Sequence, residues 1–506
     1  MKWRLFVGLV ILLIAGALRF YRLNEVPYGL SWDEAAFTYN GWSVSLWHRD
    51  EYANFMPLVF KSFGDYKPPL LVYTLGTIFK LSGLRVDMIR VVSAFSGIAT
   101  VILMYLLAKE IRPKVKRWSL LVMALGALSP WAVHFSRLGY EANMALPLVG
   151  LGVLLLFKGL NNQRFWWMAA IVLASSLYAF HNAKITVPVL LLGFGVLNWQ
   201  KIGQYLKKAM IATLLFIALS WPMVIATLYS GAGERGVQTL IFFEGGKLAS
   251  FTRVTTELVT NVGNQLSLGF WIEGWDATSV RHMSPGYGVI YKVELVFLII
   301  GLIGLIRSKN NKDRFVLWWL VAGLLPAILT HTTPHAVRSL LALPAVVLVI
   351  AEGMWVIYRS LESLGRVRWM IAVLLLLVYV GQIKAYLENY YTAYAVESAT
   401  EFQYGYKEAV AVVNKYKNDK DKIVITDAYG QPYIYFLLYN QITPEQFLFG
   451  QLALYEFRTI HWPEGQNKTL YVGTPSEIPL SDPGVLEIIT IPNTDKPVFV
   501  VAEVNE

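Results

Sequence analysis

The sequence predicts an all-α polytopic membrane protein with about 11 transmembrane helices and a small C-terminal α/β domain. Hydrophobic residues make up 56% of the 506 residues and charged residues only 15%, whereas a soluble domain carries about 25% charge. The apolar stretches are continuous, which excludes the alternating pattern of a membrane β-barrel. The 17 Trp, 28 Tyr and 26 Phe residues are of the kind that collects at membrane interfaces.

Each predicted helix corresponds to an apolar run of span length. A twelfth apolar stretch, residues 68–84, is shorter and contains Lys80, and crossing a bilayer takes about 20 residues. We therefore expect it to lie at the surface as a juxtamembrane or re-entrant helix. The eleven expected spans are 5–20, 88–110, 118–136, 142–157, 165–181, 184–199, 209–228, 289–306, 315–331, 337–357 and 369–386.

The charges of the loops support this arrangement. If residues 68–84 do not cross, six loops on one side hold 18 of the 44 Lys and Arg residues, as expected for cytoplasmic loops. The N-terminus is then cytoplasmic, and the loops 21–87 and 229–288 lie outside. The six basic loops are 1–4, 111–117, 158–164, 200–208, 307–314 and 358–368.

Composition also excludes several classes of function. The chain has no Cys, so it can hold neither a disulfide nor a thiolate metal site. Its net charge of +10 is explained by the cytoplasmic loops, and no basic helix or aromatic-basic module indicates nucleic-acid binding. The apolar N-terminus ends at Arg19 and Tyr21 and has no cleavage site, so it is predicted to be an uncleaved first span and not a signal peptide.

The C-terminal part has a different character. From about residue 388, a helical, charged stretch is followed by short β-branched runs such as IVITDAYG and VFVVAEV. This alternation predicts a small extracytoplasmic α/β domain over residues 388–506, after a membrane domain over residues 1–387. No phosphate-binding loop or nucleophile elbow occurs in it, so we expect it to shape a substrate site or contact a partner.

The first outer loop contains the motif YGLSWDEAAFTYNG. Ser31 is a candidate helix N-cap, which places Asp33 and Glu34 in the first helical turn. Two readings are open: the acids stabilise the helix N-terminus, or a partly desolvated carboxylate serves as a general base. A divalent metal ion at Asp33 and Glu34 is also left open.

Basic residues occur at the outer ends of other spans. Lys67 precedes Pro68 and Pro69, which fix the start of a helix, so it is a candidate phosphate ligand or an interfacial lysine. Ionisable residues at the ends of spans are functional candidates by default. The remaining candidates are Glu141 as a catalytic acid, Arg137 and Arg338 for a phosphate, and His181, Lys184, His335 and Trp275 for a substrate.

Four stretches resemble the GT-C membrane glycosyltransferases: LSWDEAAFTYNG, YKPPLLVYTLG, RVVSAFSGIATVILMYLLAKEI and SRLGYEANMALPL. The nearest branch holds the protein O-mannosyltransferases, which use dolichyl-phosphate-mannose, and the bacterial lipid A aminoarabinose transferases. The resemblance is specific over residues 1–200 and continues loosely to about residue 386. It implies the GT-C fold, inverting transfer, and an active site outside the cytoplasm.

The resemblance also implies roles for single residues. The acidic pair of the first outer loop matches Asp33 and Glu34, and its aspartate is the general base or positions the acceptor. The lysine before Pro-Pro, Lys67 here, binds the lipid phosphate in the aminoarabinose branch. Glu141 stands where the family usually has Leu-Asp. Tyr66 replaces the glutamate of the aminoarabinose branch, so no metal site is implied there.

The sequence therefore predicts an inverting glycosyltransferase of the plasma membrane. It would move a sugar from a polyprenyl-phosphate donor to a hydroxyl of a protein, lipid or glycan, without a nucleic-acid partner. The alternative is a polytopic transporter or lipid flippase, which would need charges along a path through the bilayer.

Overall fold

The computed structural model describes residues 2–229, 231–464 and 468–504. The chain forms two compact units, each made of separate segments. We call the first the helical unit and the second the tail unit. The helical unit holds Met1–Tyr21, Asp65–Leu70 and Arg90–Asn389, and the tail unit holds Arg22–Gly64, Leu71–Ile89 and Tyr390–Glu506.

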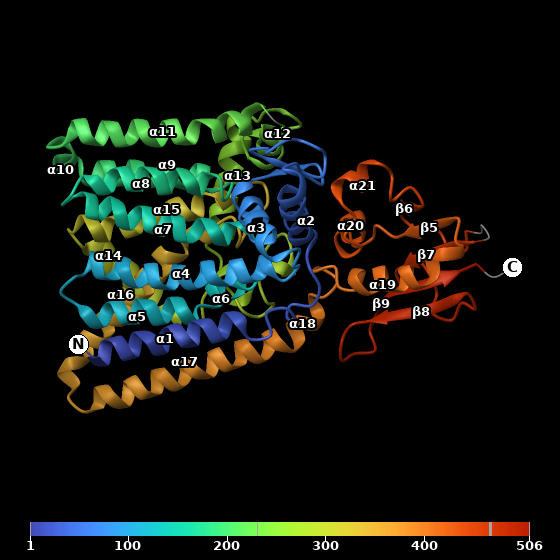
Figure 1. Cartoon of the computed structure of the whole chain (residues 1–506). Helices are drawn as coiled ribbons and strands as arrows, with labels where there is room; N and C mark the ends of the chain where they lie inside the picture. Colours follow the sequence, from blue (N-terminus) through green and yellow to red (C-terminus); the bar gives the residue numbers. More distant parts are fainter. Residues whose placement is uncertain (1, 230, 465–467, 505–506) are drawn as a thin grey trace. The chain divides into compact units, whose positions relative to one another are not determined.

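The helical unit is a bundle of nearly parallel helices (Figure 1). Each of the eleven predicted apolar runs overlaps a helix, although several runs extend past the helix ends, such as 289–306 and 337–357, which begin before the helix does. The main helices are α1 (Lys2–Phe20), α4 (Met88–Ile111), α5 (Lys116–Leu128), α6 (Pro130–Ser136), α7 (Glu141–Gly159), α8 (Arg164–Leu177), α9 (Ala183–Leu197), α11 (Leu206–Tyr229), α14 (Glu294–Arg307), α15 (Asn311–Ile328), α16 (Leu343–Ser360) and α17 (Val367–Tyr391).

Shorter elements join these helices. They are β2 (Asp65–Lys67), α10 (Trp199–Gly203), α12 (Ala232–Thr239), β3 (Phe243–Glu244), β4 (Lys247–Leu248), α13 (Phe251–Gln265), a π-helical turn (Gly269–Glu273) and 3₁₀ turns at Val280–His282, Leu340–Ala342 and Leu361–Leu364. Most of them belong to the predicted outer loop 229–288.

Several of these helices suit a membrane. Within the described residues, six are long and apolar enough to cross a bilayer, or seven if the bent pair α5–α6 is one span. The bend of 54° occurs at Ser129, whose hydroxyl caps α6 ahead of Pro130. Much of the apolar surface faces outward; Leu13 and Met370, for example, are 73% and 72% exposed. The protein is thus a polytopic membrane protein.

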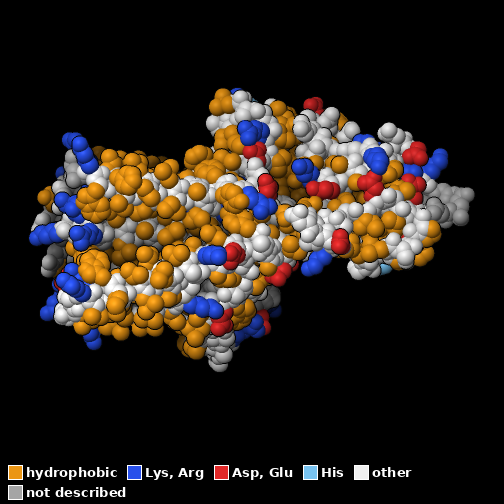
Figure 2. Space-filling model, turned by 90° about the horizontal axis from the view of Figure 1, so that it is seen from below, with side chains coloured by type: hydrophobic (Ala, Val, Ile, Leu, Met, Phe, Trp, Pro, Cys, Tyr) orange, Lys and Arg blue, Asp and Glu red, His pale blue; other side chains and the backbone are white. Residues whose placement is uncertain are grey.

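Small residues let two of these helices approach closely. A Cβ atom at Gly301 of α14 would overlap the Val349 carbonyl of α16, and one at Gly353 would overlap the Phe297 carbonyl. Such contacts are typical of helix pairs in membranes, where van der Waals packing drives association. Figure 2 shows apolar side chains along the bundle and Lys and Arg side chains gathered at its left end. This asymmetry matches the predicted basic loops, and the orientation in the membrane stays a prediction.

The tail unit combines part of the first outer loop with the C-terminal residues. Its helices are α2 (Trp32–Trp47), α3 (Pro69–Ser82), α18 (Ala393–Glu397), α19 (Tyr406–Tyr416), α20 (Tyr433–Tyr439) and α21 (Pro444–Leu448), with a 3₁₀ turn at Lys417–Asp419. Its strands are β1 (Phe60–Ser62), β5 (Lys422–Ile425), β6 (Tyr455–Phe457), β7 (Thr469–Gly473), β8 (Val485–Thr490) and β9 (Pro497–Glu503).

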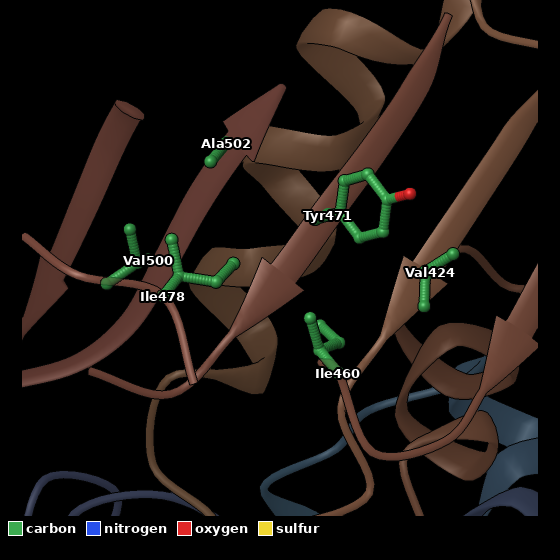
Figure 3. Packing of buried hydrophobic residues seen from close by; sticks show 6 residues of the cluster. All are labelled: Val424, Ile460, Tyr471, Ile478, Val500 and Ala502. Carbon is green, nitrogen blue, oxygen red and sulfur yellow. The ribbon is translucent and has the colours of Figure 1, made fainter. Parts of the chain in front are cut away.

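A mixed five-stranded sheet forms the predicted C-terminal α/β part. Its order is β6–β5–β7–β9–β8, with β5 parallel to β6 and β7, and β9 antiparallel to β7 and β8. Side chains from the strands and their connections form a hydrophobic cluster on the sheet (Figure 3). Its members are Val424, Ile460, Tyr471, Ile478, Val500 and Ala502.

Candidate functional site

Lys67 lies in a segment that is anchored on both sides. It ends β2 and is 8% exposed. Before it, the Tyr66 carbonyl oxygen lies 2.6 Å from His181 Nε2. After it, the Leu70 amide donates to the Tyr178 carbonyl at 3.0 Å. The end of α8 and the turn that follows it therefore fix the backbone around Lys67.

The contacts of His181 determine its tautomer. A carbonyl oxygen only accepts, so Nε2 carries the proton and donates to Tyr66. Nδ1 is then the acceptor for the Lys184 ammonium at 3.1 Å, and Lys184 also donates to Thr227 Oγ1 at 2.6 Å. These contacts give His181 and Lys184 a positioning role beside Lys67. Their predicted contact with a substrate stays a prediction.

The same turn also contacts the segment of Arg338. Asn182, next to His181, donates through its amide to the Arg338 carbonyl at 3.1 Å. The Arg338 guanidinium Nη1 donates to Thr330 Oγ1 at 2.8 Å. The turn thus joins the chain segments that carry Lys67 and Arg338, two of the three residues predicted to bind a phosphate.

Arg137 is buried and caps a helix. Its Nη1 donates to the carbonyls of Leu18, Arg19 and Tyr21 at 3.0, 3.3 and 2.8 Å. The last carbonyls of a helix lack partners within it, so Arg137 stabilises the C-terminal end of α1. Sequence spacing gave no sign of this contact, and binding of a phosphate by Arg137 stays a prediction.

Glu141 opens helix α7. Because α6 ends at Ser136 and α7 begins at Glu141, the four-residue spacing from Arg137 does not place the two residues on one helix. Asn143, in the same first turn, donates to the Ser93 carbonyl of α4 at 2.7 Å. This contact ties the N-terminus of α7 to α4 and fixes the place of Glu141, whose catalytic role is not tested.

In the tail unit, Asp33 and Glu34 occupy the first turn of α2, as predicted. Ser31 is the N-cap: its hydroxyl accepts from the Glu34 amide at 3.3 Å, and the Glu34 carboxylate accepts from the Ser31 amide at 2.9 Å. This capping box gives the buried Glu34 a structural role. Asp33 is only partly buried, and its catalytic role stays a prediction.

Residues of the C-terminal part hold the start of α2. The Tyr435 hydroxyl of α20 donates to the Leu30 carbonyl at 2.8 Å, and Gln403 Oε1 accepts from the Trp32 amide at 3.1 Å. Burial raises the pKa of Tyr435 well above its ordinary value, so the phenol remains a neutral donor. The backbone on both sides of Ser31 is thus fixed by residues about 370 to 405 positions later in the chain.

We expect Tyr435→Phe to lower stability by about 1–3 kcal/mol, since it leaves the buried Leu30 carbonyl without this donor. The midpoint of heat unfolding in detergent measures the effect. Tyr471→Phe is a matched control, because it removes a hydroxyl that donates to the Glu464 carbonyl within the sheet region. If α2 matters for activity, only Tyr435→Phe lowers activity in the fraction that remains folded. Equal losses of activity in both variants would contradict this role.

In the helical unit, Asp276, His282 and His335 form a buried cluster with one potential ligand atom each, all within 4.8 Å of one another. His282 Nδ1 lies 3.1 Å and His335 Nδ1 3.9 Å from the Asp276 carboxylate. The two imidazole rings stack at 4.8 Å. Trp275, predicted to contact substrate, is next to this cluster and 47% exposed.

The cluster fits a metal ion by its donor types, since two imidazoles and one carboxylate are a common zinc set. Its hydrogen bonds point to another role. The Asp276 carboxylate already accepts from the Ala336 amide at 2.7 Å and from the Thr278 amide at 3.0 Å. It therefore connects the outer loop to the segment that carries His335. Among the described residues, the three-ligand cluster does not include Asp33 or Glu34.

The charge of Asp276 is stabilised in the folded state. Burial raises the pKa of its carboxyl, but the hydrogen bond and charge of His282 and the charge of His335 outweigh burial and hold the pKa well below its ordinary value. A depressed carboxyl pKa contributes stability above the ordinary value, near 4. This contribution is lost as the pH falls towards the folded pKa.

We expect Asp276→Ala to destabilise the protein by about 3–5 kcal/mol at pH 7, because it removes one partner of a buried polar cluster. Heat unfolding with and without a chelator is the measurement. We expect the chelator to leave the wild-type midpoint unchanged, because protein donors already satisfy the carboxylate. A large drop with chelator, together with stoichiometric zinc by elemental analysis, would contradict this and indicate a metal centre.

A cavity of about 890 Å³ lies in the helical unit, in the predicted outer loop 229–288. Three acids line it, Glu234, Glu244 and Glu257, with the bases Arg253 and His331. Glu257 lies 2.6 Å from His331 Nδ1, and Arg253 pairs with Glu244. The sequence indicated the loop but not this cavity, because its walls come together only when residues 234–257 fold against residue 331.

No known protein family profile matches the chain, and no curated protein matches it in sequence. Solved structures do match. ArnT from Cupriavidus metallidurans bound to undecaprenyl phosphate is similar with a TM-score of 0.54 and 10% identity, over 99% of this chain and 98% of that chain. The Archaeoglobus fulgidus oligosaccharyltransferase in its apo form gives 0.53 and 12%, over 87% of this chain and 64% of that chain.

The archaeal oligosaccharyltransferase AglB, also from Archaeoglobus fulgidus, matches in its complex with an inhibitory peptide and a dolichol-phosphate. Its TM-score is 0.51 at 13% identity, over 86% of this chain and 64% of that chain. This chain thus spans about 64% of the oligosaccharyltransferase chain. At such low identity the likeness establishes the fold, and this is the GT-C fold expected from the sequence.

Proposed function

We propose that this GT-C chain is an inverting glycosyltransferase that uses a polyprenyl-phosphate-linked sugar. The observation that carries the proposal is the turn from His181 to Lys184. It contacts the backbone next to Lys67 and the backbone of Arg338, two residues proposed to bind the donor phosphate. ArnT and AglB, which share the fold, were solved with undecaprenyl phosphate and a dolichol-phosphate, and this supports a lipid-phosphate donor here.

In the proposed reaction, the acceptor hydroxyl oxygen attacks the anomeric carbon of the sugar. The bond from that carbon to the phosphate oxygen breaks, so the configuration inverts and polyprenyl phosphate leaves. Asp33 takes the acceptor proton, a role that contributes about 10²–10⁴ in rate. Lys67 and Arg338 stabilise the negative charge that develops on the phosphate, with Arg137 as a further candidate.

The other acids have supporting roles in this proposal. Glu34 holds the first turn of α2 through its capping box, and Glu141 orients the sugar or the acceptor. The acceptor enters from the side of the outer loop, where Trp275 is exposed and the 890 Å³ cavity offers polar groups. We place the N-terminus in the cytoplasm, the reaction outside it, and the domain boundary near residue 387.

A test with purified protein in detergent separates this proposal from a transporter. Detergent solution has no compartments, so a transporter or flippase leaves the donor intact. We expect time-dependent release of polyprenyl phosphate from a polyprenyl-phosphate sugar when a hydroxyl acceptor is present. An intact donor in detergent, together with movement of the donor across liposome membranes, would support the transporter instead.

A further inference from the structure

A second cavity lies at the end of the helical unit where α1 begins. It has a volume of about 770 Å³, in the range of small-molecule sites. Helices α1, α4 and α5 form its walls. Its apolar wall consists of Leu5, Leu9, Leu12, Ile102, Leu120 and Met123. Leu5 and Leu9 are 69% and 51% exposed, so the cavity is a groove on the membrane-facing side of the bundle.

The mouth of this groove is basic. Arg4, Lys109, Arg112 and Lys116 line it, and none of its described lining residues is acidic. Arg112 is already paired, through Nη1 with Glu352 at 2.6 Å. Among the described residues, no ion pair involves the other three, and Arg4 Nε is buried without a hydrogen-bond partner. The mouth therefore carries an excess of positive charge that an anion would offset.

The groove is distant from the candidate active site. Helix α4 has 24 residues, which corresponds to a length of about 36 Å. Ser93, near its start, contacts Asn143 beside Glu141, whereas Lys109 lies near its end. Lys109 follows Ser93 by 16 residues on this helix, a rise of about 24 Å, so the groove is a second site and not an extension of the one near Glu141.

We propose that this groove binds an anionic phospholipid. An acyl chain would lie along the leucines of α1 and α5, and the headgroup phosphate would contact Arg4, Lys109 and Lys116. A free phosphate would leave the apolar wall unused, and a neutral lipid would leave the basic charges uncompensated. The combination of an apolar groove with a cationic mouth fits an amphiphile with a negative headgroup.

Native mass spectrometry of the full, delipidated chain tests this with added phosphatidylglycerol and with phosphatidylcholine of the same acyl chains. The groove variant is R4Q/K109Q/K116Q. The matched control, K201Q/K207Q/K309Q, removes the same charge from exposed positions in other basic loops. We expect phosphatidylglycerol to bind the groove variant about a hundredfold more weakly, since each base near a membrane surface contributes roughly fivefold, and the control within about twofold of wild type.

A second variant tests the groove without a change of charge. A Cβ atom at Gly8 would lie 4.0 Å from Leu120 Cδ2, so Gly8→Leu places a larger side chain into the groove. We expect it to weaken phosphatidylglycerol binding as well. If the triple variant does not fold, Gly8→Leu and the single variant Lys116→Gln still test whether phosphatidylglycerol binds in the groove. Equal losses in both triple variants, equal affinity for both lipids, or normal binding by Gly8→Leu would overturn the proposal.

Discussion

Replacing Asp33 with Asn is expected to lower sugar transfer by about 10²–10⁴-fold, the contribution of a positioned general base. The amide keeps the size of the side chain but cannot accept the acceptor proton. Asp33 is only partly buried, and the capping box uses Ser31 and Glu34, so α2 should fold normally. Release of polyprenyl phosphate, measured as an initial rate, gives the effect, and the midpoint of heat unfolding checks the fold.

Glu25→Gln provides the matched control for Asp33→Asn. Glu25 lies in the same outer loop, and its 2.7 Å ion pair with Arg22 is solvent-exposed, so its loss should change stability by less than about 1 kcal/mol. The control should keep the wild-type rate. A wild-type rate for Asp33→Asn would remove Asp33 from the mechanism. A loss that is restored by raising the pH would assign the proton transfer to another group.

Replacing Lys67 with Met is expected to lower the rate by about 10²–10³-fold, the usual effect of removing one group that stabilises developing charge. Met has a similar length but no charge. Since the neighbouring backbone is held by His181 and Tyr178, the segment should keep its shape. The rate with saturating donor and the affinity for polyprenyl phosphate are both measured, because a phosphate ligand affects both.

Lys80→Met is the control, since Lys80 is exposed on α3, and it should behave as wild type. A further variant, His181→Ala, tests the anchoring. It leaves Lys67 charged but removes the donor to the Tyr66 carbonyl, so it should lower the rate less than Lys67→Met does. A larger loss in His181→Ala than in Lys67→Met would make His181 the functional residue and Lys67 its neighbour.

The sequence predicted correctly the features that depend on residues close together in the chain. Ser31 was recognised as an N-cap from the residues that follow it, and the capping box is present. The start of α3 at Pro69 followed from two prolines. Each of the eleven apolar runs overlaps a helix, although several runs extend past the helix ends and one, residues 118–136, is bent at Ser129. Each of these features depends on residues within a few positions of one another.

The contacts of the candidate site residues were not predictable in the same way. The Arg137 guanidinium caps α1, which lies about 116 to 119 positions earlier in the chain, and its predicted role at a phosphate stays a prediction. Asp276 lies in the predicted outer loop 229–288, and it connects His282, Thr278 and Ala336. Which of these distant groups pair depends on which helices pack together. A single sequence does not show that packing directly.

The sequence by itself determined the membrane class, the number of apolar runs, the asymmetric basic loops and the GT-C likeness, because hydropathy and charge act through composition and short spacing. Only the tertiary structure decided that His181 and Asn182 hold the segments of Lys67 and Arg338, and that Tyr435 and Gln403 fix the start of α2. These hydrogen bonds satisfy buried polar groups, and their partners become neighbours only after the chain has folded.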